Sequence, residues 1–155
     1  QWPGPAAIAS KVTCLWFGRG VLHPFDIYLT FTTTCYCYQS IVLVLPDGGE
    51  VVYDRISPGG GFADAELEAT KSTTFYKSRV KWNGTGWDLT FKDGSVWFFP
   101  EESPIQSMRD RYGNTTYLTR TNGGTGNIQR IVSPNGRYVE FTYDTGNHNQ
   151  SVLGQ

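Results

Sequence analysis

The sequence lacks an excess of charge of either sign, because 13 Lys and Arg stand against 14 Asp and Glu in 155 residues, a formal net charge of -1. That balance gives no general attraction to nucleic acid or to an anionic membrane. Long hydrophobic runs are also missing: the longest, Ile41 to Leu45, is far short of the roughly 20 residues that a membrane helix needs. We therefore expect no nucleic-acid partner and no membrane span.

Cysteine and histidine are scarce, with three Cys and two His. Cys35 and Cys37 would share one face of a strand, a placement that rarely suits the narrow geometry of a disulfide, whereas Cys14 could pair with either. His23 has no paired C-x-x-C spacing near it, so we predict no metal site.

Residue patterns typical of catalysis are missing as well. No Ser lies in a G-x-S-x-G context, and His148 lies in a polar tail. Asp64, Glu66 and Glu68 alternate and could line one face of a strand as calcium ligands, but the EF-hand spacing is absent. The glycine-rich stretch 123–127 lacks the P-loop Lys-Ser/Thr pair. The sequence therefore predicts no enzyme, no catalytic residue and no cofactor.

Aromatic residues and turn formers are abundant, with 5 Trp, 9 Tyr, 9 Phe, 18 Gly and 8 Pro. This composition favours short strands and tight turns over helices. Alternation over Tyr76–Trp82 predicts a strand with one polar face, and the segment 62–69 is a loop, an extended stretch or one short helix capped by Asp64. Strand-turn-strand patterns predict four hairpins, over residues 41–53, 88–99, 105–119 and 128–143.

The turn glycines recur along the chain. Gly94, Gly113 and Gly136 are 19 and 23 residues apart, and Gly48 lies 46 residues before Gly94. Asp-Gly between apolar runs favours a positive φ and a two-residue hairpin loop. A period near 20 residues with one hairpin per unit indicates a repeat array in which neighbours must stack. We predict an all-β fold of successive antiparallel hairpins that form one curved or spiral sheet.

One family resemblance rests on four ordered segments. Residues 135–144 combine Gly-Arg, an alternating strand and Tyr-Asp, and resemble the tyrosine-aspartate (YD) repeat of Rhs proteins. The other segments are similar to the preceding repeat, to the start of the Rhs core and to the strand pair that leads into the repeats; they are residues 108–114, 17–26 and 86–94. Tyr143-Asp144 is the one complete Tyr-Asp pair within the repeat part.

This resemblance implies a structural protein, a segment of the β-shell of an Rhs/YD-repeat polymorphic toxin. Such a shell encapsulates or presents a C-terminal effector, in bacterial toxins that are secreted or delivered to the cell surface. Its partners would be the rest of the shell and the effector. The expected regions are an unassigned segment (1–16), a β-rich region (17–100), YD-type hairpins (101–144) and a polar tail (145–155).

An alternative function comes from the aromatic residues of one stretch. Trp82, Trp87 and Trp97 could stack on sugar rings if they lay exposed on a sheet, as in a free-standing carbohydrate-binding β-domain that binds cell-surface glycans. Aromatic residues in cross-strand pairs are also ordinary stabilisers of a sheet. The last predicted strand, Tyr138 to Tyr143, carries Glu140 as its one charge, so we also expect self-association through an unprotected edge.

Overall fold

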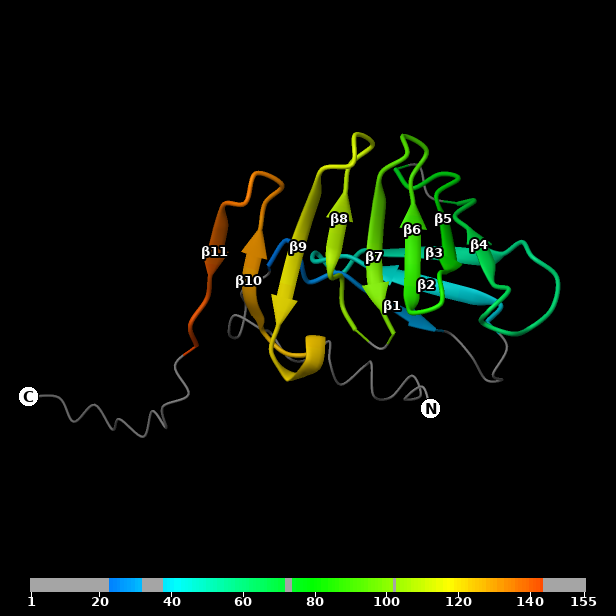
Figure 1. Cartoon of the computed structure of the whole chain (residues 1–155). Helices are drawn as coiled ribbons and strands as arrows, with labels where there is room; N and C mark the ends of the chain where they lie inside the picture. Colours follow the sequence, from blue (N-terminus) through cyan, green and yellow to red (C-terminus); the bar gives the residue numbers. More distant parts are fainter. Residues whose placement is uncertain (1–22, 32–37, 72–73, 102, 144–155) are drawn as a thin grey trace, which may run out of the picture.

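The computed structural model describes residues 23–31, 38–71, 74–101 and 103–143. Its eleven strands form one antiparallel sheet in which each strand pairs with its neighbours in sequence (Figure 1). The predicted all-β, hairpin-by-hairpin fold is thereby confirmed. The strands are β1 (Tyr28–Phe31), β2 (Ser40–Val44), β3 (Glu50–Arg55), β4 (Glu66–Glu68), β5 (Arg79–Trp82), β6 (Gly86–Thr90), β7 (Val96–Pro100), β8 (Ser107–Arg109), β9 (Thr115–Arg120), β10 (Ile128–Val132) and β11 (Tyr138–Glu140).

The four predicted hairpins share one turn, and its loop has three residues rather than the two we expected. In the β6–β7 turn, the Phe91 N–H donates to the Ser95 carbonyl at 2.9 Å, and the Gly94 N–H donates to the Phe91 carbonyl at 3.0 Å. Gly94 has φ +87°. This is a type I turn followed by one left-handed residue, for which glycine is the best fit. The same pair of bonds recurs around Gly48, Gly113 and Gly136.

Side chains before these glycines explain why Asp and Asn occur there. Asp93 Oδ1 accepts the Ser95 N–H at 2.9 Å, and Asp47 Oδ1 accepts the Gly49 N–H at the same distance. A short acidic or amide side chain thus satisfies a backbone donor that the turn leaves unpaired. The turn geometry is therefore specified locally, by two adjacent residues.

Three predicted boundaries need correction. Residues 74–77 form a turn with Lys77 at φ 60°, so the strand predicted from Tyr76 begins only at Arg79. Segment 62–69 contains the short strand β4, in which Leu67 points into the core between the buried residues Ala65 and Ala69. The last strand ends at Glu140 instead of Tyr143.

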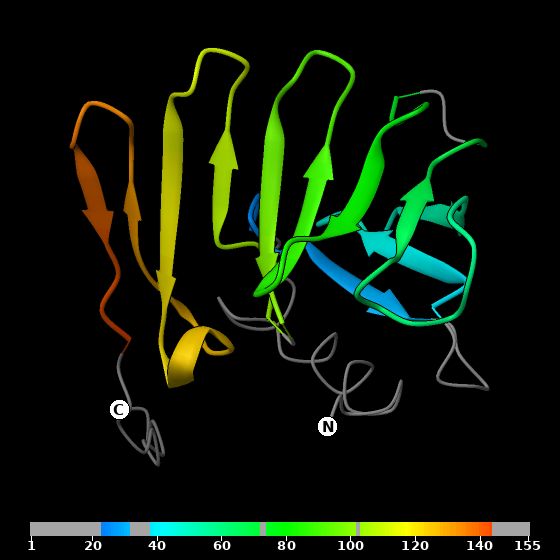
Figure 2. The same ribbon diagram turned by 45° about the vertical axis from the view of Figure 1, so that its right-hand side comes forward.

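The sheet bends so that β1–β3 lie behind β5–β7, and the apolar faces of the two parts pack together (Figures 1 and 2). Trp87 on β6 is 1% exposed, and its ring centroid lies 5.6 Å from that of Phe31 and 5.7 Å from that of Tyr38. Tyr53 and Ser78 hydroxyls hydrogen-bond across the same interior at 2.8 Å. The core is thus formed by strands distant in sequence.

The strands β8–β11 have no facing layer of strands among the described residues. Instead, the segment before β1 runs along their inner side, and the Ile105 N–H donates to the Ile27 carbonyl at 2.9 Å. Leu118 and Ile128 are buried there, whereas Val139 on β11 is 57% exposed. Within the described ranges, no helical segment has the length and apolar character of a membrane-spanning helix.

We expect Gly94→Val to lower the free energy of unfolding by about 1–3 kcal/mol, because a β-branched residue fits poorly at φ +87°. Chemical denaturation with a far-UV circular dichroism readout measures the change. Gly61→Val is the matched control: a Cβ meets no atom within 4 Å at Gly61 and makes only an ordinary 3.8 Å contact at Gly94, but Gly61 has no positive φ. Equal denaturation midpoints for the two variants would contradict the turn assignment.

Candidate functional site

The three tryptophans proposed to stack on sugars do not form one surface. Trp82 and Trp87 contact each other, with centroids 5.2 Å apart, whereas Trp97 packs 4.8 Å from Phe91 in another aromatic group. Trp87 is buried, so its ring has no face open to a ligand. Trp82 and Trp97 are half-buried on the inner face of the sheet. A sugar platform made of all three residues is incompatible with this arrangement.

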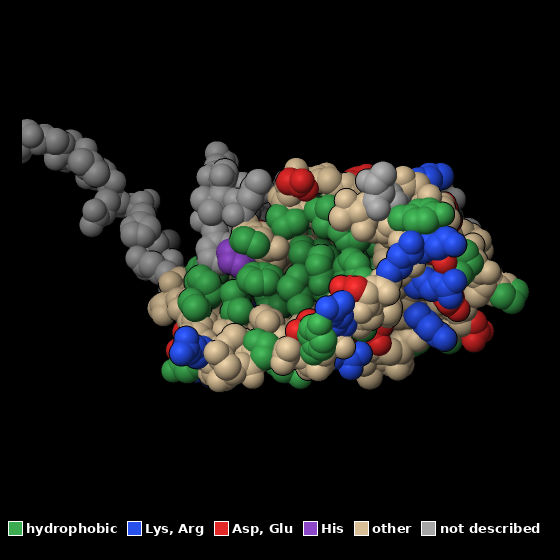
Figure 3. All heavy atoms as spheres, turned by 90° about the horizontal axis from the view of Figure 1, so that it is seen from above, with side chains coloured by type: hydrophobic (Ala, Val, Ile, Leu, Met, Phe, Trp, Pro, Cys, Tyr) green, Lys and Arg blue, Asp and Glu red, His purple; other side chains and the backbone are tan. Residues whose placement is uncertain are grey.

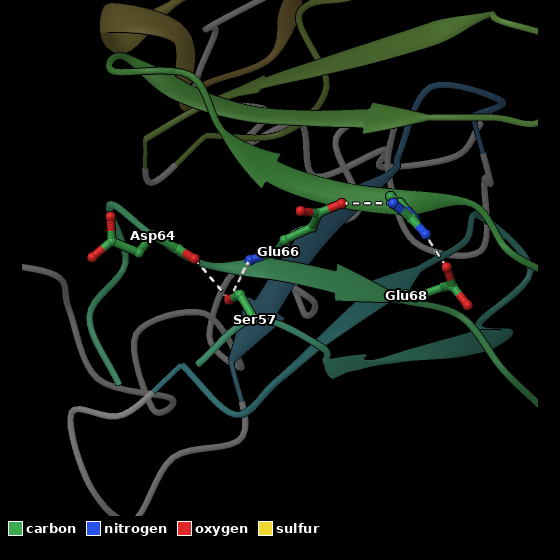
Figure 4. Close-up of polar contacts among 5 residues, drawn as sticks. Ser57, Asp64, Glu66 and Glu68 are labelled. Atoms are coloured by element: carbon green, nitrogen blue, oxygen red, sulfur yellow. Dashed lines mark hydrogen bonds and ion pairs between the residues drawn. The ribbon is translucent and has the colours of Figure 1, made fainter. Parts of the chain in front are cut away.

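Two of the three alternating carboxylates, Glu66 and Glu68, are paired with one arginine. Arg79 on β5 donates from Nη1 to Glu66 at 2.8 Å and from Nε to Glu68 at 2.9 Å, and the hydrogen bond to Glu68 raises the Arg79 pKa (Figure 4). The Asp64 carboxylate points away from both glutamates (Figure 4). Across the part of the chain that the structure describes, no group of three or more His, Cys, Asp and Glu could hold a metal ion.

Ser57 explains how this row is positioned. Its hydroxyl donates to the Asp64 carbonyl at 2.7 Å and accepts the Glu66 N–H at 3.0 Å, which fixes the entry into β4 (Figure 4). Arg55 organises the same loop, because its guanidinium donates to the carbonyls of Ser57, Pro58 and Gly61 at 2.8–3.0 Å. The acidic row is therefore a packed and bonded part of the fold.

A buried polar cluster lies between the first described segment and β9. Arg120, at 7% exposure, donates from Nη2 to the Phe25 carbonyl at 2.8 Å and from Nη1 to the Gly126 carbonyl at 3.5 Å. It joins residues 95 apart in sequence. Sequence reasoning did not identify Arg120, although its place after Thr116 and Leu118 in the β9 alternation puts it on the inner face. A charged residue at an inward-facing position of a strand is the sequence signal that could have identified Arg120.

Asp26 and His23 complete this cluster. Asp26 Oδ2 accepts the His23 N–H at 3.3 Å, while Oδ1 is buried and has no hydrogen-bond partner within the described residues. Burial raises the Asp26 pKa, although the hydrogen bond from His23 and the charge of Arg120 oppose this. His23 Nδ1 accepts the Phe25 N–H at 3.2 Å, so neutral His23 carries its proton on Nε2. Burial lowers the His23 pKa, partly offset by Asp26.

The surroundings of the cluster are those of a structural tie. The His23 ring lies 5.3 Å from the Phe25 ring and 6.1 Å from the Phe141 ring. The Tyr143 hydroxyl donates to the Ile128 carbonyl at 2.7 Å, and burial raises its pKa. No Ser, Thr or Cys among the described residues forms a hydrogen bond with His23 in the way that a nucleophile bonds to its base. The cluster connects the chain entry to the later hairpins.

The inner face of the sheet carries apolar side chains that remain partly accessible. Viewed from above, hydrophobic side chains gather in the middle of the molecule, and Lys and Arg side chains gather on one side of them (Figure 3). Half-buried residues on this face include Phe75, Phe91, Trp97 and Met108. Aromatic rings there contact one another at 4.8–6.3 Å. This face can contact another apolar surface.

We expect Arg120→Met to lower the free energy of unfolding by about 2–4 kcal/mol, because it leaves Asp26 buried without its cation. The double variant Asp26→Asn with Arg120→Met should lose less than the sum of the single variants, since the uncompensated charge is then gone. Urea denaturation of all four proteins measures the coupling. Strictly additive losses would show that the two residues do not interact.

We expect His23 to make the fold less stable as the pH falls below the usual value of 6.5. Its pKa is lowered in the fold, so the unfolded chain binds the proton first and stability is lost between 6.5 and the folded value. Denaturation midpoints at pH 7.5 and 5.5 should differ more for the parent chain than for His23→Gln. His148, which lies outside the described residues, is present in both proteins and cancels in the comparison. The same pH dependence in both proteins would contradict this assignment.

Comparison with known protein families, curated protein sequences and solved structures gives no match to the chain. Within the described ranges, the chain provides a buried polar tie, an acidic row paired with Arg79 and a half-buried apolar inner face.

Proposed function

We propose that the chain is a wall segment of an Rhs/YD-repeat shell that helps to encapsulate or present a C-terminal effector. One observation carries the proposal: the sheet is an uninterrupted meander whose strand order follows the sequence and ends at β11. A sheet without crossovers can be extended hairpin by hairpin, because each new unit pairs only with the one before it.

The two faces of the sheet support the same proposal. On β5 and β6, Lys81 and Asp88 lie opposite each other on the outer side, while Val80 and Leu89 lie on the inner side. A wall of this kind meets solvent outside and offers a half-buried apolar lining inside. The effector and the remainder of the shell would be its partners, in a bacterial protein that is secreted or delivered to the cell surface.

The edge of β11 is where such a wall would continue. The Phe141 N–H donates to the Gln129 carbonyl, and the Arg137 carbonyl accepts the Ser133 N–H. On the β11 side of this hairpin, the main-chain groups of the odd-numbered residues therefore point to β10. In an antiparallel ladder the groups of Tyr138 and Glu140 then point away from β10. No described strand pairs with that side. An edge of this kind is a template for the next hairpin or, without it, for a second copy.

The carbohydrate-binding alternative loses one of its three proposed stacking residues, because Trp87 is inside the core. Trp82 and Trp97 remain half-buried and lie in separate aromatic groups. Glycan-array binding that is lost in Trp97→Ala, with the circular dichroism spectrum retained, would favour the alternative. Binding that survives both Trp82→Ala and Trp97→Ala would remove these residues from it.

The edge provides the test of the proposal. We expect the isolated chain to grow in size with concentration, and Glu140→Pro to suppress this, because it removes an outward N–H while the ladder to β10 stays intact. Glu140→Gln is the matched control: it also loses the 3.5 Å ion pair to Arg130 but keeps the N–H. Sedimentation velocity across a concentration series, with circular dichroism as a folding check, measures both effects.

A monomer at every concentration would show a covered edge and a closed domain, which contradicts the wall proposal. Equal association of the Glu140→Pro and Glu140→Gln variants would place the contact elsewhere. The encoded sequence downstream of residue 155 gives an independent check. We expect further units of about 20 residues with a turn glycine in each, followed by a non-repetitive effector region.

A further inference from the structure

A hollow lies between the loop that leads into β5 and the β6–β7 turn. Its volume is about 260 Å³, and Phe75, Tyr76, Phe91, Lys92, Asp93 and Ser95 line it. Pockets for drug-sized ligands run from about 300 to 1,000 Å³, so this one suits a ligand of a single ring. It is separate from the polar cluster around Arg120 and from the β11 edge.

The floor of the hollow is aromatic and well supported. The Phe75 and Phe91 centroids are 5.7 Å apart with their planes at 44°, and Trp97 packs on both rings at 6.3 Å and 4.8 Å. Trp97 belongs to β7, so the sheet itself holds these rings in place. A fixed apolar floor suits a ligand that has one flat, weakly polar face.

The wall of the hollow carries a cation at a defined place. Lys92 Nζ lies 4.8 Å from the centroid of the Tyr76 ring, and Lys77 Nζ lies 5.8 Å from the same centroid. Tyr76 is 45% exposed and lies in a turn in which Lys77 has φ 60°. A non-glycine residue in that region is strained, and strain of this kind concentrates at functional sites. The Lys77 N–H bond to the Ala69 carbonyl at 2.8 Å stabilises the turn.

Groups that can hydrogen-bond to hydroxyls line the same hollow. Asp93 Oδ1 accepts both the N–H and the hydroxyl of Ser95, at 2.9 and 2.6 Å. The Ser95 hydroxyl bond lowers the Asp93 pKa, so the carboxylate is ionised at neutral pH and Oδ2 can accept from a ligand. Arg111 adds positive charge near Asp93. The lining thus combines one cation, Lys92, with one carboxylate acceptor, Asp93.

We propose that this hollow binds a hexuronic acid residue of an acidic polysaccharide. The flat face of the sugar ring would lie on Phe75 and Phe91, its carboxylate would meet Lys92, and its hydroxyls would donate to Asp93. A neutral sugar would leave the Lys92 ammonium without a ligand partner. An inorganic anion would use the cation and leave the aromatic floor uncovered. The combination of floor, cation and acceptor fits a ring that is both hydroxylated and anionic.

Calorimetric titration with a trimer of galacturonic acid tests the proposal, with the neutral trimer of galactose and inorganic phosphate as comparison probes. We expect the acidic trimer to bind, and Lys92→Gln to weaken binding about tenfold or more, because a charge-assisted hydrogen bond is lost. Lys81→Gln is the matched control. It removes the same charge from the outer face, opposite Glu66 and Asp88, and should keep the affinity of the parent chain.

Three results would overturn the proposal: no binding of the acidic trimer, equal affinity for the neutral trimer, or equal weakening by Lys92→Gln and Lys81→Gln. Phosphate that competes with the trimer at similar affinity would reduce the site to a general anion site and would also overturn it. Trp97 lies under the floor, so quenching of its fluorescence on binding, absent in Trp97→Phe, should locate the ligand. Glu140→Pro should bind the trimer normally, so failure here is distinguishable from failure of the wall proposal.

Discussion

The burial of Trp87 is the constraint on which the rest of the structure depends. A sheet in which every strand pairs only with its sequence neighbours is one layer thick and cannot bury its apolar face alone. The chain solves this by bending the sheet, so that rings from β1 and from the segment before β2 reach Trp87 on β6. The Tyr53–Ser78 hydrogen bond satisfies two polar groups inside the same contact. The short strand β4 lies at the bend and contributes Leu67 to the core.

The later hairpins are held by a different interaction. No second layer of described strands covers β8–β11, and the first described segment takes that place. Because an isolated buried charge is costly, Arg120 requires the Phe25 carbonyl and the nearby Asp26 carboxylate to be in position. The polar tie therefore determines how the entry segment lies on the sheet. It covers only part of the inner face, which remains half-buried toward β11.

These two modes of burial have a functional consequence. Where β1–β3 face β5–β7, the inner side of the sheet is a closed core. Where β8–β11 have no facing strands among the described residues, the inner side is an apolar lining that can contact another molecule. The proposed wall requires the accessible apolar lining of the single-layered part. The proposed carbohydrate site requires a local hollow that contains polar groups. The hollow beside Lys92 arises where the loop into β5 and the β6–β7 turn approach each other. The proposed sugar site therefore does not overlap with the edge of β11, at which the proposed wall would continue.

The sequence by itself determined the all-β class, the positions of the four hairpins and the alternation of β5, because these depend on neighbouring residues. Asp93-Gly94 specifies a turn through bonds within five residues, although the dipeptide pattern did not distinguish a loop of three residues from the expected loop of two. Tertiary structure alone decided that Trp87 is buried, that Arg79 pairs with both Glu66 and Glu68, and that Arg120 meets a carbonyl 95 residues away. The Arg79 contacts depend on the pairing of β4 with β5, and the Trp87 and Arg120 contacts join segments far apart in the sequence, so only the folded sheet brings these residues together.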